Sequence, residues 1–243
     1  MGTRKYRPYR KDSDISYTVG VYPTIELLTK RPDLAERVLT STEIVPSEGY
    51  TRIHTLCSKL SLNLEKNDRL IARLCSRKDC HALGIFRKTN PPLVPDSHHI
   101  LLHRPTGRGN AGTIIRSMAG FGLRNLILIR PAVDLWHPSV IRASMGSLFQ
   151  IGFRYFDSIE EYFSYAKLPR FVLSKEGKVC LSDLKVKSTS VFIFGNEGEG
   201  IPPNTAEGAT TVRINQTDGI DSLNLSVAAG ITLYSLSRKK MTE

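Results

Sequence analysis

Residues 191–202 read Val-Phe-Ile-Phe-Gly-Asn-Glu-Gly-Glu-Gly-Ile-Pro, a short apolar run followed by a glycine-rich turn. The apolar run predicts a buried strand, and the turn offers free backbone groups at its end. The turn lacks the Gly-Lys-Ser/Thr ending of a phosphate loop, and carboxylates at Glu197 and Glu199 repel phosphate. Its glycine spacing also differs from the dinucleotide fingerprint. The turn therefore favours a ligand that is cationic, or neutral and amide-like.

Around this turn, the second half of the chain alternates between apolar runs and amphipathic stretches. This alternation predicts a mostly parallel α/β sheet, whose ligands bind beyond the carboxyl ends of the strands. The expected strands are residues 99–102, 125–129, 170–174, 190–194 and 210–214. The expected helices are residues 110–121, 138–150, 158–166 and a long final helix that Asp221 caps.

Three prolines at residues 91, 92 and 95 interrupt both helix and strand, and they mark a domain boundary. We therefore expect two domains, residues 1–93 and residues 94–243. In the first, residues 24–30 and 50–62 read as amphipathic helices and residues 82–86 as a short strand.

The chain carries a formal net charge of +11 and a pI near 9.6, which favours a nucleic-acid partner. Residues 1–90 hold 17 of the 34 basic side chains against 10 acidic ones. Cations at Arg4, Lys5, Arg7 and Arg10 alternate with two tyrosines. This segment is typical of an RNA-contacting arm with stacking rings, and equally of a solvated tail.

The first residues are polar and basic, so we expect no secretory signal and no membrane span, and a cytoplasmic location. The four cysteines are then expected to be reduced thiols. Cys75, Cys80 and His81 lie close together, but no second pair at ligand spacing follows, so no metal site is expected.

Two further segments break the ordinary pattern of an α/β core. In residues 110–122 the apolar side chains form one helical stripe, while Arg116 points elsewhere between Gly112 and Gly120. In residues 214–230 an expected helix is apolar nearly all round, so Ser222 and Asn224 would enter the interior as polar groups that need partners.

The three segments, in this order and spacing, resemble the three motifs of the SpoU (TrmH-type) branch of the SPOUT methyltransferases. The resemblance covers residues 98–243 and includes residues 141–148, which are similar to a family segment with a Ser-x-Gly pattern. The region up to Lys88 resembles, less closely, the ribosomal-protein-like RNA-binding domain that many members carry.

The resemblance implies an α/β fold with a C-terminal SPOUT domain, a parallel sheet and a deep trefoil knot. A smaller α/β RNA-binding domain would precede it. It further implies S-adenosylmethionine as the cofactor, a homodimer that completes each site, and transfer of a methyl group to a ribose 2′-OH. The separate RNA-binding domain favours ribosomal RNA over transfer RNA as the substrate.

By position in the motifs, the resemblance implies cofactor contacts at Gly195, Ile214 and Leu223, with Glu197 and Gly200 shaping the turn. Substrate positioning and catalysis are implied for Asn110, Arg116, Glu197, Ser222 and Asn224. An arginine is almost always protonated, so we expect Arg116 to stabilise developing alkoxide charge, or to act with an RNA phosphate that takes the proton.

The sequence departs from the family pattern at two places. Residues 107–109 are Gly-Arg-Gly where the family often has Asp-Pro-Gly, and Asn215-Gln216 replace the common Pro-Met. Two other functions remain as alternatives: a SPOUT enzyme that methylates a base nitrogen, and a noncatalytic RNA-binding or ribosome-assembly protein on the same fold.

Overall fold

The computed structural model describes residues 6–196, 198, 200–217, 219 and 221–240. It divides into two compact units: unit 1 contains Met1–Thr89 and Asp134–Phe149, and unit 2 contains Asn90–Val133 and Gln150–Glu243. These units differ from the predicted domains at two places: residues 90–93, expected in the first domain, belong to unit 2, and residues 134–149, expected in the second domain, belong to unit 1.

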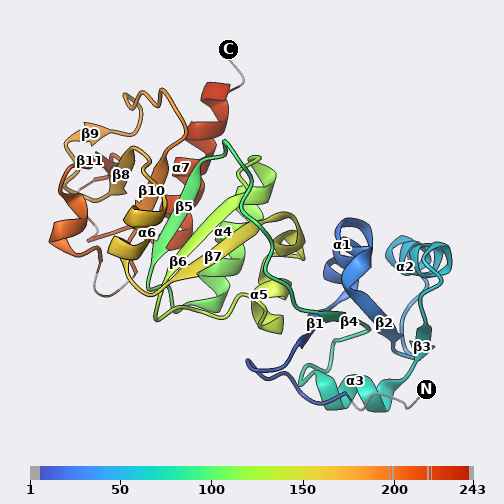
Figure 1. Cartoon of the computed structure of the whole chain (residues 1–243). Helices are drawn as coiled ribbons and strands as arrows, with labels where there is room; N and C mark the ends of the chain where they lie inside the picture. Colours follow the sequence, from blue (N-terminus) through green and yellow to red (C-terminus); the bar gives the residue numbers. More distant parts are fainter. Residues whose placement is uncertain (1–5, 197, 199, 218, 220, 241–243) are drawn as a thin grey trace. The chain divides into compact units, whose positions relative to one another are not determined.

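Unit 2 is built on a parallel sheet that, within the described residues, has seven strands in the order β7-β6-β5-β10-β8-β11-β9 (Figure 1). The strands are β5 (His99–His103), β6 (Asn125–Ile129), β7 (Gly152–Phe156), β8 (Arg170–Leu173), β9 (Val179–Cys180), β10 (Val191–Phe194) and β11 (Thr210–Arg213). The helices are α4 (Arg108–Gly120), α6 (Ile159–Tyr165) and α7 (Leu225–Lys240), with a 3-10 turn at Pro203–Ala206, while the 3-10 turn Ser147–Gln150 begins in unit 1 and ends at the first residue of the second segment of unit 2.

The central strands are buried along their whole length because both faces of a parallel sheet are covered. Every residue of β5, β6 and β10 is buried. The predicted α/β class with a mostly parallel sheet is therefore confirmed, and five predicted strands correspond to β5, β6, β8, β10 and β11. Strands β7 and β9 were not predicted from the sequence.

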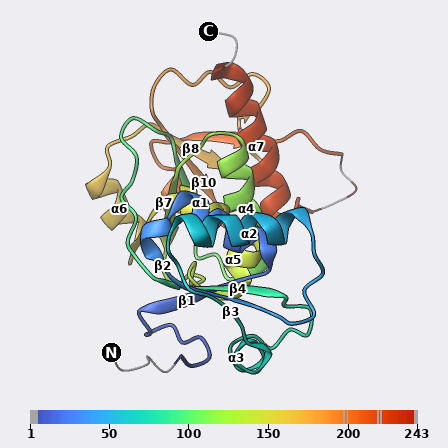
Figure 2. The same ribbon diagram turned by 90° about the vertical axis from the view of Figure 1, so that its right-hand side faces the viewer.

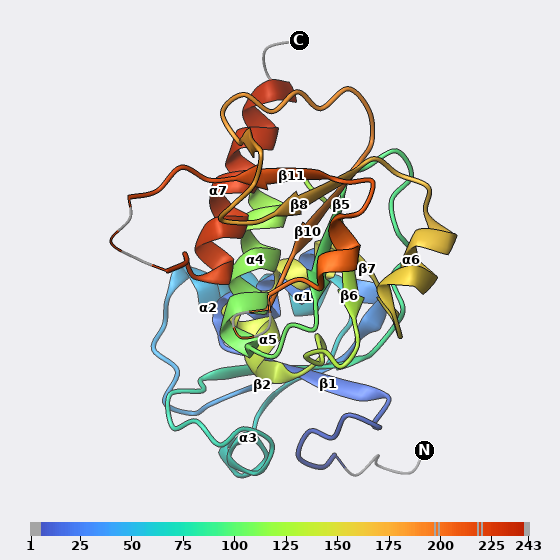
Figure 3. The same ribbon diagram turned by 90° about the vertical axis from the view of Figure 1, so that its left-hand side faces the viewer.

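Helices α4 and α7 pack side by side in unit 2 (Figure 3). The predicted stripe on α4 is confirmed, since Ala111, Ile114, Ile115 and Met118 are buried while Arg116 is exposed. The predicted start of the last helix at Asp221 is wrong: α7 begins at Leu225. Of the described residues, none belongs to a helix that is both long and apolar enough to cross a bilayer.

Unit 1 has a four-stranded sheet in the order β1-β4-β2-β3, in which β4 runs antiparallel to both neighbours. Its strands are β1 (Ile15–Val19), β2 (Ala35–Thr40), β3 (Leu64–Lys66) and β4 (Ala82–Arg87). Its helices are α1 (Val21–Lys30), α2 (Glu48–Lys59), α3 (Asp68–Leu74) and α5 (Pro138–Ala143), with a 3-10 turn at Pro32–Leu34. Helices α1 and α2 lie on one side of this sheet and α3 on the other (Figure 2).

Residues 134–149 belong to unit 1 because their aromatic side chains complete its core. Phe86 of β4 packs edge-on against Trp136 and Phe149, with ring centroids 5.5 and 5.1 Å apart. The helix predicted over residues 138–150 is also interrupted. It ends at Ala143, and Met145 and Gly146 follow with φ values of 52° and 83°.

Buried His99 at the start of β5 makes the stability of unit 2 depend on pH. Its Nδ1 lies 2.9 Å from the hydroxyl of buried Tyr162. Burial, and then the neighbouring His98, lower the pKa of His99 below its ordinary value of 6.5. The unfolded chain therefore takes up this proton at a higher pH than the folded chain does, so stability is lost as pH falls below about 6.5.

We expect the urea midpoint of unfolding to fall between pH 7.5 and pH 5, and to fall less in a His99→Gln variant. His54, which is exposed on α2, provides the control, because His54→Gln should leave the pH dependence as in the wild type. Equal pH dependence in all three proteins would contradict a role for His99.

Candidate functional site

A cavity of about 800 Å³ lies in unit 2 where β8, β10 and β11 end. Parallel strands present their carboxyl ends at one edge of the sheet, which is where α/β proteins bind ligands. The walls include six residues that the sequence analysis singled out: Gly195, Gly200, Ile214, Ser222, Leu223 and Asn224. The structure thus brings parts of two distant motifs into a single site.

The glycine-rich turn after β10 closes tightly on itself. A Cβ atom on Gly195 would lie 2.4 Å from the carbonyl carbon of Gly200, so only glycine permits this approach. Gly200 itself has a φ of 69°, a conformation that glycine adopts without strain. A bridge joins Asn196 to Gly200, and the Asn196 side-chain oxygen accepts a hydrogen bond of 3.0 Å from the Gly198 amide. Glu197, a predicted site residue, lies outside the described residues.

The connection before α7 carries the second set of predicted residues. Ser222 and Asn224 are exposed and line the cavity, so the expectation that they enter the protein interior on a helix is wrong. Asn224 instead caps α7, because its Oδ1 accepts hydrogen bonds from the backbone amide and the hydroxyl of Ser226, at 2.8 and 2.7 Å. The side chain is therefore held in a fixed orientation at the edge of the cavity.

The segment of residues 110–122 is linked to this site through Asn110. The Asn224 side-chain amide donates a hydrogen bond of 3.3 Å to the Oδ1 of Asn110 on α4. Arg116 also lies on α4, but it is exposed and is absent from the described residues that line the cavity. A Cβ atom added to Gly120, on the same helix, would meet no described atom within 4 Å, so no close backbone approach explains that glycine.

Two of the predicted RNA-contacting residues, Arg7 and Arg10, belong to unit 1 and do not line this cavity. Arg7 and Arg10 are exposed and line a separate hollow, whereas Tyr6 between them and the chain start is buried. Arg4 and Lys5 lie outside the described residues.

A third wall of the cavity, the turn that follows β8, was not predicted from the sequence. Lys175 and Glu176 line the cavity there. This turn is pressed against β11, since a Cβ atom on Gly177 would lie 2.3 Å from the carbonyl carbon of Val212. One signal in the sequence could have identified this turn. It follows the predicted strand that corresponds to β8, and β8 lies in the sheet beside β10, the strand that leads into the glycine-rich turn.

The cavity suits a small organic ligand with an apolar part and a charged part. Its volume falls within the roughly 300–1,000 Å³ of small-molecule sites. Phe194, Ile201 and Leu225 supply apolar walls, while Lys175 and Glu176 supply one charge of each sign. Among the residues that the structure describes, no group of three or more His, Cys, Asp or Glu side chains is arranged to hold a metal ion.

A family model described as the SpoU rRNA methylase family matches residues 97–234 of the chain, which include the cavity and α4. The chain belongs to the SpoU rRNA methylase family. Curated relatives agree with this assignment. An uncharacterized tRNA/rRNA methyltransferase of Synechocystis is 30% identical over 145 residues, which are 58% of this chain and 53% of that protein.

A second relative of this SpoU family member is the 23S rRNA (uridine(2479)-2′-O)-methyltransferase of Streptomyces viridochromogenes. It is 29% identical over 160 residues, which are 62% of this chain and 56% of the relative. The chain therefore matches about half the length of these two curated relatives.

Solved structures show the same fold. An S-adenosylmethionine-bound rRNA methyltransferase from Sinorhizobium meliloti has a TM-score of 0.79 at 24% identity, over 96% of this chain and 90% of that one. A SpoU methyltransferase from Streptomyces viridochromogenes, solved with S-adenosylmethionine, has a TM-score of 0.80 at 21% identity, over 95% and 92%. The fold of the SpoU family member is thus shared along nearly the whole chain.

Proposed function

We propose that the protein transfers a methyl group from S-adenosylmethionine to a ribose 2′-OH of RNA. The observation that carries this proposal is the single cavity at the carboxyl ends of β8, β10 and β11, which gathers two family motifs and touches the third through Asn110. Membership of the SpoU family and the names of the relatives support the reaction type.

The residues of the cavity fit S-adenosylmethionine. The apolar walls at Phe194, Ile201 and Leu225 suit an adenine ring, and the tight turn at Gly195 and Gly200 presents backbone groups to it. Lys175 and Glu176 suit the carboxylate and ammonium of the amino-acid end. When bound, the cofactor supplies a methyl group on a positively charged sulfur. Ile214 and Leu223 would contact it mainly through their backbone.

The chain's remaining task is to align the 2′-oxygen with that methyl group and to help it lose a proton. The linked amides of Asn110 and Asn224 lie at the cavity edge, where they position the ribose, and Ser222 stands beside them. As the oxygen–carbon bond forms and the carbon–sulfur bond breaks, the Arg116 guanidinium stabilises the negative charge on the oxygen. An adjacent RNA phosphate accepts the proton.

Arg116 reaches such a site in a homodimer, which forms part of this proposal. Helix α7 exposes three apolar side chains spaced for one helical face, with Val227 47%, Ile231 40% and Tyr234 52% exposed. The Tyr234 ring also contacts Phe121 at the end of α4, 5.9 Å between centroids. A second copy that covers this face would bring its own α4, and hence its own Arg116, to the first copy's cavity.

The proposal includes the trefoil knot and the RNA-binding role of residues 1–93 that the family resemblance implies. Strand β10 lies between β5 and β8 in the sheet. After β10 the chain forms β11 on the far side of β8, and α7 then packs against α4. This path supports a threaded arrangement. The first unit favours ribosomal RNA as the substrate. In keeping with this, the rRNA methyltransferase structure matches 96% of the chain, whereas a structure described for 2-OH methylation of C/U34 on tRNA matches 62%.

The test is to incubate the protein with methyl-labelled S-adenosylmethionine and unmodified ribosomal and transfer RNA transcripts, and to identify the labelled nucleoside after digestion. We expect a 2′-O-methyl nucleoside from ribosomal RNA. Label on a base would overturn ribose specificity. Measurable cofactor binding without transfer to either RNA would favour a noncatalytic RNA-binding protein.

A further inference from the structure

The segment formed by residues 6–14 is held against unit 1 by its two tyrosines. The Tyr6 ring is 9% exposed, its hydroxyl donates a 3.4 Å hydrogen bond to Glu36, and the Arg37 guanidinium lies 5.6 Å from the ring centroid. The Tyr9 hydroxyl donates to Asp134. These rings anchor residues 6–14 and are not presented for stacking on bases, so the interpretation of them as stacking rings is wrong. Residues 6–14 are not a solvated tail either, whereas Arg4 and Lys5 lie outside the described residues.

Helix α3 shares the same side of the sheet as this segment. Ile71 and Leu74 of α3 belong to one buried cluster with Tyr6 and Tyr17, whereas α1 and α2 pack in a separate cluster on the other side. Side chains alternate across a strand, so the two clusters occupy opposite faces of the sheet. We call the outer surface of residues 6–14 and 68–78 the arm–α3 face.

The arm–α3 face displays an excess of unpaired cations. Six of its basic side chains are exposed and make no ion pair within the described residues; they are Arg7, Arg10, Lys11, Arg69, Arg73 and Lys78. Residues 6–14 and 68–78 together hold seven basic residues against three acids, Asp12, Asp14 and Asp68, and Asp68 accepts hydrogen bonds from Thr42. On the opposite side, α1 and α2 are nearly balanced, with two glutamates against three basic residues.

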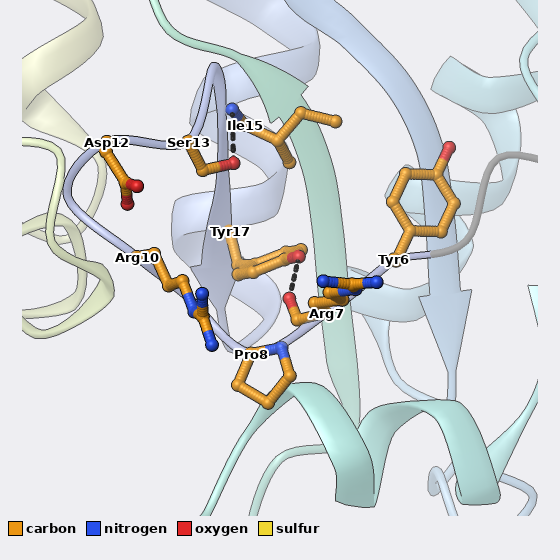
Figure 4. A pocket seen from close by; sticks show the side chains of 8 residues that line it. All are labelled: Tyr6, Arg7, Pro8, Arg10, Asp12, Ser13, Ile15 and Tyr17. Atoms are coloured by element: carbon orange, nitrogen blue, oxygen red, sulfur yellow. Dashed lines mark hydrogen bonds between the residues drawn. The ribbon is translucent and has the colours of Figure 1, made fainter.

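A hollow of about 220 Å³ opens within the arm–α3 face. Its charged lining residues are Arg7, Arg10 and Asp12, so two cations outnumber one carboxylate there, and the other lining residues are Tyr6, Pro8, Ser13, Ile15 and Tyr17. Figure 4 shows the chain curving from Pro8 to Ser13 around this hollow, with the Arg10 guanidinium between the two limbs of the curve. The Tyr17 hydroxyl donates to the Arg7 carbonyl and fixes one limb in place. The volume of the hollow is large enough for a phosphate group, and Figure 4 shows the Arg10 and Arg7 side chains on opposite sides of Tyr17.

We propose that the arm–α3 face binds the phosphate backbone of double-stranded RNA, with Arg7 and Arg10 each contacting a phosphate. This inference rests on the proposed function and adds which face of unit 1 meets the substrate and which RNA form it takes. Fixed cations without available aromatic rings suit a helical backbone, whereas single strands are bound through base stacking.

The experiment measures binding of the full chain to a fluorescein-labelled 20-base-pair RNA duplex of arbitrary sequence between 50 and 300 mM salt. We expect Arg69→Ala combined with Arg73→Ala, and Arg7→Ala combined with Arg10→Ala, each to weaken binding about tenfold. Each pair should also lower the slope of log K against log salt by about 2, since each lost phosphate contact accounts for about 0.9. A single-stranded probe should bind the wild type more weakly.

The matched control removes two cations from the opposite side of the sheet, with Arg52→Ala and Lys59→Ala on α2, and should bind the duplex within about twofold of the wild type. All replaced side chains are exposed, so unfolding midpoints should match. Three results would each overturn the inference. They are an equal loss of duplex binding in the control pair, unchanged duplex binding in the Arg7/Arg10 and Arg69/Arg73 pairs, and tighter binding of the single-stranded probe than of the duplex. Methyl transfer by the wild type is scored separately. If it fails while the binding losses appear, only the proposed reaction is wrong.

Discussion

We expect Gly195→Ala to weaken S-adenosylmethionine binding by about 100-fold. The new Cβ atom would lie 2.4, 2.6 and 2.8 Å from three backbone atoms of Gly200, and backbone cannot move aside as a side chain can. Overpacking of this kind costs about 1–3 kcal/mol, and each 1.4 kcal/mol is a factor of about ten in affinity. Both glycines line the cavity, so the strain falls on the wall that contacts the ligand. Titration calorimetry measures the loss.

Gly198→Ala, in the same turn, is the matched control. A Cβ atom there meets only the Asn196 Oδ1, at 3.9 Å, which is ordinary contact. We expect this variant to bind S-adenosylmethionine within about threefold of the wild type. Equal affinities for Gly195→Ala and Gly198→Ala would show that closure of the turn does not shape the cofactor site.

The second large effect concerns Arg116. We expect Arg116→Lys to lower methyl transfer about 100-fold, because a lysine lacks the planar fork of donors that stabilises an oxyanion next to a phosphate. Cofactor affinity should stay unchanged, since Arg116 is exposed on α4 and is not among the described cavity residues. The measurement is single-turnover transfer to RNA beside calorimetry with the cofactor. Near full turnover in Arg116→Lys would exclude a role that requires the guanidinium group.

Mixed dimers show whether Arg116 acts in the cavity of its own copy or in the cavity of the partner copy. Consider a dimer in which one copy carries Arg116→Lys and the other carries Gly195→Ala. One of its two sites is intact only if the Arg116 of each copy acts in the cavity of the other copy. Random pairing makes half of the dimers mixed, each with one working site, so about a quarter of the wild-type activity should return. No recovery would place Arg116 and Gly195 in the same copy's site.

The parts of the fold that the sequence predicted depend on local pattern. The apolar runs of β5, β6 and β10 are buried on both faces, so their composition alone identifies them. Strand β9 has two residues, which is too short for a periodicity to register. Trp136 and Phe149 gave no local sign that their packing partner is Phe86, because that contact depends on the tertiary fold.

The residues of the candidate site also divide into those that local sequence identifies and those that only the tertiary fold identifies. Gly195 and Gly200 were identifiable because a glycine cluster after a strand needs a physical reason. Lys175 and Glu176 were missed because their turn looks ordinary until β8 is placed beside β10. Asn224 was identified for the wrong reason: it caps α7 at the cavity edge, whereas the apolar residues after it suggested that the helix began earlier.

The placement of residues 134–149 in unit 1 affects how the chain folds as it is synthesised. The strands of unit 1 are complete by residue 87, but Phe86 still lacks Trp136 and Phe149 at that point. Domains generally fold in order as the nascent chain leaves the ribosome. Unit 1 cannot finish in that order, because it must wait until β5, α4 and β6 have emerged. The core of unit 1 can therefore close only after residue 149 has been synthesised, when the first strands of unit 2 have already emerged.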